Sequence, residues 1–158
     1  ITQPKSDNTK KFYRVGCAGK IVSFEETIDK RYLITLEGVL RCKIKEEIPE
    51  KGGYKRMKVD YKNFSDDLIN DEQNIQRKVF LSVLKKYFKV KNISADWNII
   101  NELDNQKLIT NLAMICPFSN EEKQALLEAN SLDERANLMI TMLEIGSFEE
   151  RQSDEKKH

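Results

Sequence analysis

The chain has 158 residues, 39% of them hydrophobic, which is enough for one domain with a core or for two small ones. Its 27 Lys+Arg and 26 Asp+Glu residues give a formal net charge of +1, which argues against an obligate nucleic-acid-binding protein. No run of about 18 apolar residues occurs, so no transmembrane helix is expected. Because the first residues are polar, we also expect no secretory signal and a cytoplasmic location.

The small net charge conceals two differently charged parts. Residues 1–63 contain 15 basic and 9 acidic residues, whereas residues 64–158 contain 12 basic and 17 acidic residues. Opposite charges of this kind favour an interface between the two parts, or between copies of the chain, over binding to nucleic acid.

Residue types that carry common catalytic chemistry are scarce. The single histidine, His158, is the last residue, so neither a Ser-His-Asp triad nor a histidine-rich zinc site is expected. The cysteines form no C-x-x-C pair and are interpreted as buried, reduced thiols: Cys17, Cys42 and Cys116. No glycine-rich phosphate-binding motif occurs. We therefore expect no catalytic residue, no metal ligand and no cofactor.

Residues 12–61 have the pattern of β-strands. From residue 32 to residue 44 the apolar side chains alternate with period two, which predicts a long strand with one dry and one half-wet face. The dry face would hold Tyr32, Ile34, Leu36, Gly38, Leu40, Cys42 and Ile44. Strands are also predicted at about residues 13–27 and 54–61, and Gly38 and the glycines at 16 and 19 predict β-bulges.

Residues 70–146 have the pattern of helices. Apolar side chains at helical spacing, capping boxes, and Pro117 as a stop predict five of them. They cover about residues 75–88, 94–103 and 107–116, and the last two begin at Ser119 (with Glu122) and at Ser131 (with Glu134). Gly146 is expected to end the last helix.

Because all strands precede all helices, the sequence predicts an α+β protein with segregated parts. We expect a β-rich pseudo-barrel at residues 1–63, a helical bundle at residues 64–148 and a mobile tail at residues 149–158.

Two segments carry a resemblance to a known family. The first runs from Tyr13 through Gly16-Cys17-Ala18-Gly19 to Val22 and is followed by residues 31–41, Arg-Tyr-Leu-Ile-Thr-Leu-Glu-Gly-Val-Leu-Arg. The second joins residues 116–119, Cys-Pro-Phe-Ser, to residues 122–128, Glu-Lys-Gln-Ala-Leu-Leu-Glu. In this order and separation they resemble the N-terminal domain of Lon proteases over about residues 12–145.

The resemblance implies a PUA-like pseudo-barrel followed by a helical bundle. It fits best the short members that consist of this domain alone. It also implies that the chain recognises unfolded or extended polypeptide without ATPase or peptidase activity, since no trace of those domains is present.

The chain departs from the family pattern in three places. Cys42 replaces an aromatic residue, and the turn has Asp29-Lys30 where Asp-Gly is usual. Family members usually begin with two strands and a helix, and we interpret residues 1–4 as the end of a strand whose start is missing. We therefore expect a partial barrel with an open sheet edge, which favours a homo-oligomer.

Aromatic and basic residues alternate near the end of the β-rich part. Tyr54, Met57, Tyr61 and Phe64 lie among Lys55, Arg56, Lys58 and Lys62. An ordinary strand with inward aromatics explains this pattern most simply. An adaptable surface for unfolded polypeptide is the first functional alternative, and aromatic stacking with phosphate contacts to RNA is the second.

Other candidates have structural explanations. Trp97 has helical spacing with Ile100 and is expected to pack between helices. Arg41 is expected to pair with Glu25 or Glu26. The adjacent carboxylate pairs are interpreted as structural: Glu25-Glu26, Glu46-Glu47, Asp66-Asp67 and Glu121-Glu122.

Overall fold

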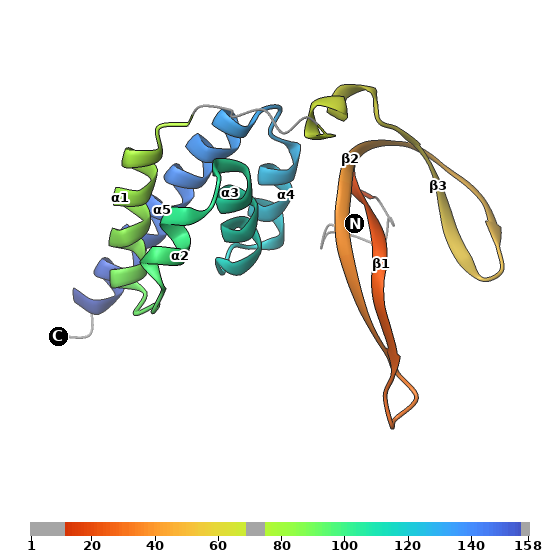
Figure 1. Ribbon diagram of the computed structural model, residues 1–158, viewed down its shortest axis with the longest axis horizontal. Coiled ribbons are helices and arrows are strands. Elements are labelled where there is room, and N and C mark those ends of the chain that lie inside the picture. Colours follow the sequence, from red (N-terminus) through yellow and green to blue (C-terminus); the bar gives the residue numbers. More distant parts are fainter. Residues whose placement is uncertain (1–11, 69–74, 156–158) are drawn as a thin grey trace. The chain divides into compact units, whose positions relative to one another are not determined.

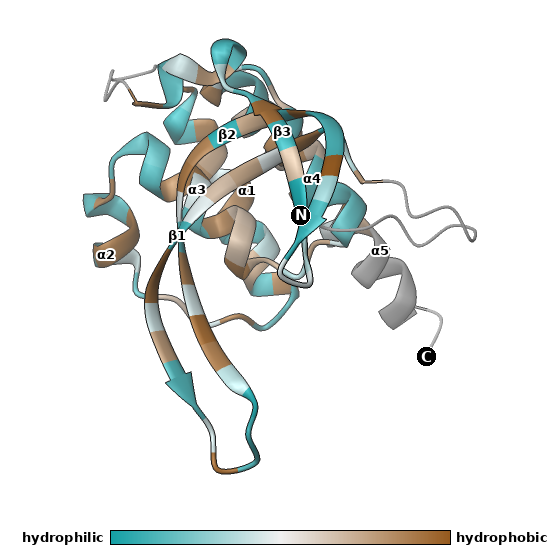
Figure 2. Ribbon diagram, turned by 90° about the vertical axis from the view of Figure 1, so that its right-hand side faces the viewer, coloured by the Kyte–Doolittle hydropathy of each residue, from teal (hydrophilic) through white to brown (hydrophobic). Residues whose placement is uncertain are grey.

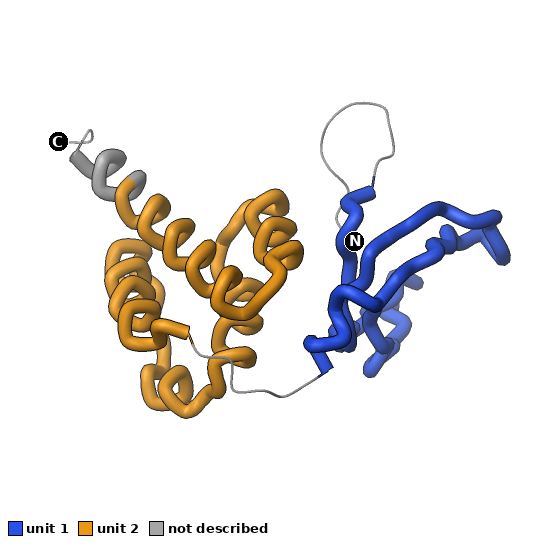
Figure 3. The backbone as a smooth tube through the Cα atoms, turned by 90° about the horizontal axis from the view of Figure 1, so that it is seen from above, with its two compact units in different colours: residues 1–70 blue, residues 71–158 orange. Residues whose placement is uncertain are grey.

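The computed structural model describes residues 12–68 and 75–155, and the side chains of residues 12–68 and 75–148. All its strands precede its helices, which confirms the predicted α+β class (Figure 1). The chain forms two compact units, residues 1–70 and residues 71–158 (Figure 3). The strand end predicted at residues 1–4 lies outside the described residues.

The first unit is built on an antiparallel sheet with the strand order β1-β2-β3. Its strands are β1 (Val15–Glu26), β2 (Tyr32–Lys51) and β3 (Tyr54–Asp60). The long β2 is central, because it pairs with β1 from Tyr32 to Lys43 and with β3 from Lys43 to Lys51. Each neighbour thus covers only part of β2, and the described strands form an open sheet.

A β-bulge interrupts the pairing of β1 with β2 at the predicted glycines. Ala18 lies opposite Leu40 and Gly19 lies opposite Gly38, so Val39 is an extra residue on β2. Regular pairs flank this residue, as expected of a bulge, and a second shift follows between Ile21 and Ser23, where Val22 is an extra residue on β1.

The extra residue changes which side chains of β2 share a face. Leu36 lies opposite Ile21 and Arg41 lies opposite Cys17, and regular alternation along β1 puts Ile21 and Cys17 on one face. Leu36 and Arg41 therefore share a face. The prediction of one dry face from residue 32 to residue 44 is wrong, because its second half lies on the other side of the sheet.

The turn between β1 and β2 places a lysine where glycine is usual. Lys30 has a φ of +61°, a left-handed conformation that costs less for glycine. The turn has its own polar contacts: Arg31 Nη2 lies 2.6 Å from Asp29 Oδ2, and the Thr27 hydroxyl donates to the same carboxylate. The bonds from Thr27 and Arg31 lower the pKa of Asp29. They hold the turn in shape despite its unfavourable lysine.

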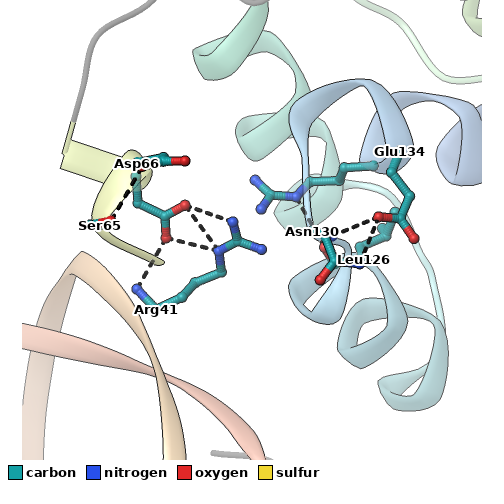
Figure 4. A network of polar contacts seen from close by, with 8 residues as sticks. Arg41, Ser65, Asp66, Leu126, Asn130 and Glu134 are labelled. Atoms are coloured by element: carbon teal, nitrogen blue, oxygen red, sulfur yellow. Dashed lines mark hydrogen bonds and ion pairs between the residues drawn. The ribbon is translucent and has the colours of Figure 1, made fainter. Parts of the chain in front are cut away.

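A short 3-10 segment, η1 (Lys62–Leu68), packs on β2 through a buried arginine. The Arg41 guanidinium donates to both carboxylate oxygens of Asp67, with an Nη2–Oδ1 distance of 2.6 Å, and the Arg41 backbone N–H donates to Oδ2 (Figure 4). Arg41 also lies over the Phe64 ring, 4.7 Å from its centroid. Arg41 is 8% exposed and Phe64 7%, so this contact is largely dry.

The predicted partner of Arg41 is therefore wrong. Glu25 lies opposite Leu33, far along the hairpin from Arg41, and Asp67 provides the carboxylate instead. The predicted division of the chain after residue 63 falls inside η1, whereas the first compact unit extends to residue 70.

Replacing Asp67 by Asn should lower the free energy of unfolding of the first unit by about 3 kcal/mol, because a buried guanidinium loses the carboxylate that balances its charge. Hydrogen exchange of the β2 amides in urea measures this loss. Asp66→Asn, which changes an exposed neighbouring carboxylate, should cost less than about 0.5 kcal/mol. Equal losses in the two variants would contradict the assignment.

The described part of the second unit, residues 75–155, contains five helices with one apolar core. They are α1 (Arg77–Val90), α2 (Trp97–Glu102), α3 (Asn105–Ile115), α4 (Asn120–Glu128) and α5 (Leu132–Glu155). Fully buried side chains from four of them meet in the core: Phe80, Leu84, Leu108, Ile109, Leu126, Met139 and Leu143. Trp97 packs against Phe88 with ring centroids 5.8 Å apart, which confirms its predicted packing role. No described helix is long and apolar enough to cross a membrane.

Both predicted capping serines are N-terminal caps. Ser119 and Glu122 exchange two hydrogen bonds, with Ser119 N–H to Glu122 Oε2 at 2.7 Å, which is a complete capping box. Ser131 accepts the Glu134 N–H at 3.1 Å, but the Glu134 carboxylate accepts from the N–H of Asn130. The second capping box is therefore incomplete, because the Glu134 carboxylate binds the N–H of the residue before the capping serine.

Helix α5 does not end at Gly146, contrary to the prediction, and continues to Glu155. A Cβ atom at Gly146 would lie 3.0 Å from Cε2 of Tyr87, which is buried on α1. Gly146 therefore allows α5 and α1 to approach closely, and it does not act as a helix stop. Residues 149–155, expected to begin a mobile tail, belong to this helix.

Gly146→Ala should lower the midpoint of thermal unfolding, although alanine is favoured over glycine by about 1 kcal/mol inside an unobstructed helix. The new methyl group would press on the Tyr87 ring. In a Tyr87→Leu background the ring is gone, and the same substitution should then be stabilising. Trp97 fluorescence during heating measures both effects, and stabilisation in the unmodified background would refute the close contact.

Candidate functional site

The four side chains predicted to form a binding surface do not lie together. Tyr54 and Met57 point to opposite faces of β3, and the Tyr54 ring packs on Gly52 in the β2–β3 turn, 3.3 Å from its ideal Cβ position. Phe64 is buried beneath Arg41, and Tyr61 is partly exposed just beyond β3. Of the four, Met57 lines the groove described below, and the other three do not.

Two of the four basic residues in this segment, and Lys45 on the neighbouring strand, are paired with acids across the sheet. Nζ–O distances are 3.6 Å for Lys55–Glu47, 3.0 Å for Lys58–Glu46 and 3.1 Å for Lys45–Asp60. The Lys62 backbone N–H and Lys45 together lower the pKa of Asp60. Exposed pairs of this kind add little stability, but they cancel much of the positive charge of the segment.

Met57 faces a groove of about 430 Å³ where the chain enters the sheet. The groove is lined by Phe12, Tyr13, Arg14, Lys43, Ile44, Lys45, Glu46, Glu47 and Met57, and we call it the Met57 groove. The Ile44 N–H donates to the Arg14 carbonyl oxygen at 2.7 Å, and β1 pairs with β2 only as far as Lys43. The groove therefore lies where β2 continues beyond its partner.

Sequence reasoning missed the first three residues of this groove. Residues 13 and 14 were assigned to a strand, whereas β1 begins at Val15. The available signal was the Phe12-Tyr13-Arg14 run itself, in which bulky side chains precede the glycine-rich strand. Nothing in that run indicated that it would face Met57, because this contact depends on the register of β2 with β3.

A second surface covers one face of the β1–β2 hairpin. Its side chains are exposed although they are apolar: Ile21 (58%), Phe24 (60%), Tyr32 (60%), Ile34 (46%) and Leu36 (65%). We call this set the hairpin face. Phe24 and Tyr32 stack with ring centroids 5.0 Å apart, and hydrophobic stretches recur along both strands (Figure 2). Contiguous exposed apolar surface on a folded protein usually marks an interaction site.

The hairpin face was predicted to be dry, and this prediction is wrong for the described residues. Of the apolar side chains in the predicted dry face, those from Tyr32 to Leu36 are exposed on the hairpin face, whereas Cys42 is buried on the other side of the sheet. Nothing within residues 12–68 packs over the outer half of the hairpin.

The cysteines are free thiols in two kinds of environment. Cys42 and Cys116 are buried, as predicted, and burial raises the pKa of both thiols, that of Cys116 to about 11. Cys17 is exposed on β1, so the prediction of a buried thiol is wrong there. Within residues 12–68 and 75–148, no group of three or more His, Cys, Asp or Glu side chains is placed to hold a metal ion.

Comparison with known proteins agrees with this architecture. The N-terminal domain of Lon protease from the Mycobacterium avium complex has a TM-score of 0.63 at 17% identity, over 90% of this chain and 75% of that one. A Lon N-terminal domain protein from Xanthomonas campestris has a TM-score of 0.57 at 13% identity, over 82% of this chain and 68% of that one. At such identities the likeness is one of fold. No curated protein matches the sequence significantly.

A family model provides the identification. The model of the ATP-dependent protease La (LON) substrate-binding domain matches residues 2–144, nearly the whole chain. It includes both resemblance segments and the strands and helices that contain them. The chain therefore belongs to the family of Lon substrate-binding domains.

Proposed function

We propose that the protein binds unfolded or extended polypeptide through its sheet unit and performs no chemistry on it. The observation that carries this proposal is the hairpin face, whose aromatic and aliphatic side chains are about half exposed or more. Membership of a substrate-binding family supports the same function. Unfolded polypeptides differ from folded proteins in exposing apolar side chains, and a face of this kind removes them from water.

Backbone geometry adds a second contribution to binding. β1 is an edge strand of the described sheet, so its outer side presents N–H and C=O groups to a partner. An extended polypeptide can pair with such an edge while its alternate side chains contact the hairpin face. Main-chain pairing is indifferent to sequence, which suits a protein that recognises unfolded clients.

The alternative function, binding of RNA by the basic sheet unit, has weaker support. Lys45, Lys55 and Lys58 contact carboxylates, which leaves fewer cations for phosphates. Phe24 and Tyr32 stack on each other, so their facing sides are not available to nucleotide bases. A cytoplasmic location is part of the proposal, because three free thiols suit a reducing compartment.

Ile34→Ser should weaken binding of fluorescently labelled β-casein, an unfolded probe, by about tenfold or more, since one aliphatic side chain contributes about 1.5–3 kcal/mol when buried. Leu33→Ser is the matched control, because Leu33 is an aliphatic residue on the opposite face of β2 and is 61% exposed, against 46% for Ile34. It should leave the affinity nearly unchanged. Fluorescence anisotropy measures both, and equal losses would exclude the hairpin face as the binding surface.

The same titration separates the two candidate functions. Binding driven by apolar contacts should persist from low to moderate salt, whereas phosphate-driven binding of single-stranded RNA should fall steeply. Tight, salt-sensitive RNA binding together with no binding of β-casein would favour the alternative.

We further propose that, in the absence of polypeptide, two copies of the chain pair through the same outer edge of β1, so that a polypeptide competes with the second copy for its backbone groups. A symmetric antiparallel pair centred between Val22 and Ser23 would set Lys20 opposite Glu25 of the second copy, and Ile21 opposite Phe24 of the second copy. Each copy would then match the other in both charge and apolar contact.

Small-angle scattering should accordingly give the mass of a dimer. Lys20→Glu should shift the equilibrium toward the monomer, because it sets two carboxylates opposite each other. Combining it with Glu25→Lys restores opposite charges and should restore the dimer. A monomer for the unmodified chain at high concentration would rule out this pairing.

A further inference from the structure

Charge is unevenly distributed in the second unit. Helix α1, residues 77–90, contains five basic residues and no acidic residue, whereas residues 91–148 contain four basic and nine acidic residues. The first helix of this unit is therefore positively charged, and the remainder is negatively charged.

Three lysines of α1 lie on the side of the helix that faces away from α5. At about 100° per residue, Lys78, Lys85 and Lys89 lie within about 20° of the direction opposite Tyr87. Tyr87 is buried beside Gly146 of α5, and the three lysines are exposed. We call them the α1 lysines. The first and last of them are about 16 Å apart along the helix axis.

The α1 lysines have no carboxylate partner among the described side chains. The ion pairs of those side chains all involve other lysines and arginines, such as Lys107 with Asp104. Lys85 Nζ lies 5.2 Å from the centroid of the Trp97 ring, a contact that positions the lysine without neutralising its charge. The three positive charges are therefore available to a partner.

Helix electrostatics accounts for only one of the α1 lysines. Lys89 lies in the last turn, where the helix dipole favours a cation. Lys78 lies in the first turn, where the dipole disfavours one, and α1 has no acidic residue there, whereas α4 and α5 each have two. Lys85 and Lys89 also repel each other, because they are four residues apart. Departures from local stability rules of this kind are expected where a surface serves a contact outside the chain.

The surroundings of the α1 lysines favour an acidic polypeptide over a nucleic acid. The neighbouring aromatic ring, that of Trp97, already contacts Phe88 and Lys85, so it offers no open platform for a base. The nine acidic residues of residues 91–148 repel a long polyanion, whereas a short acidic segment can lie along α1 alone.

A second copy of the chain is a less suitable occupant. Four acidic side chains of this unit accept backbone N–H bonds at the starts of α2 to α5: Asp96, Asp104, Glu122 and Glu134. They are spread over different helices and are used within their own chain. They therefore form no continuous acidic segment that could lie along α1.

We infer that the α1 lysines form a docking surface for an acidic segment of another polypeptide. An extended segment of about six residues spans the surface, and carboxylates on its alternate residues are about 6.6 Å apart. This spacing matches Lys85 and Lys89, which are about 6 Å apart along the helix. The inference goes beyond the proposed function, because it assigns a second binding surface, which recognises charge, to the helices.

Two fluorescein-labelled peptides test the inference. One consists of four Glu-Ser repeats and the other of four Gln-Ser repeats, so neither has an apolar side chain for the hairpin face. The full chain should bind the Glu peptide about tenfold more tightly at low salt, because it can form three ion pairs that the Gln peptide cannot. The difference should shrink at high salt, where the pairs are screened. Equal affinities in fluorescence anisotropy would overturn the inference.

Substitutions on α1 locate the binding. Lys78→Gln and Lys89→Gln should each weaken binding of the Glu peptide about threefold, whereas Lys89→Arg, which keeps the charge, should retain it. Lys123→Gln is the control, because it removes the same charge from α4, a helix that packs on α3 and α5, and it should have little effect. Circular dichroism shows that each variant is folded. A loss in Lys123→Gln as large as that in Lys89→Gln would refute a docking surface on α1.

Two further measurements examine the other occupants. If a single-stranded oligonucleotide of equal charge bound more tightly than the Glu peptide and lost affinity in Lys78→Gln and Lys89→Gln, the surface would belong to nucleic acid. If these variants had a lower mass than the unmodified chain in small-angle scattering, it would belong to a second copy. Either result would overturn the inference. Ile34→Ser should leave the affinity for the Glu peptide unchanged, so this inference and the proposed function can fail separately.

Discussion

A single buried ion pair, between Arg41 and Asp67, holds η1 against β2 in the first unit. Arg41 is nearly inaccessible to water, and a guanidinium in that position is tolerable only when a carboxylate binds it with good geometry. Asp67 does so with two oxygens, and the Phe64 ring covers the guanidinium plane. The segment that leaves the sheet is thereby attached to the middle of β2. This point lies next to the residues at which pairing with β1 ends and pairing with β3 begins.

The two ends of β2, on either side of this ion pair, have different surfaces. Toward the β1 turn, the strand presents aliphatic and aromatic side chains that no described residue covers. Toward the β3 turn, the charges of β2 are largely paired with those of β3, beside the Met57 groove. An exposed apolar surface and a groove bordered by charge pairs are thus built on one strand.

Local patterns predicted local structure well. The glycines predicted the bulge, the serines predicted the helix caps, and the helical spacing of Trp97 predicted its packing role. Each of these features depends on residues that are close in sequence. Contacts between distant segments were not predictable in the same way. The partner of Arg41 lies 26 residues away in the sequence. Gly146 is a residue type that often ends a helix, but here it allows close contact with Tyr87. The Met57 groove was missed for the same reason, since it joins three separate segments.

The extra residue at Val39 has a consequence for how this strand can change in length. Because it inverts the alternation of faces, it brings the buried Arg41 to the same side of the sheet as Leu36. Loss of that one residue would turn Arg41 away from η1 and point its neighbours there instead. Only insertions or deletions of an even number of residues keep each side chain on its present face of the sheet. The bulge therefore restricts the changes in length that this hairpin can tolerate.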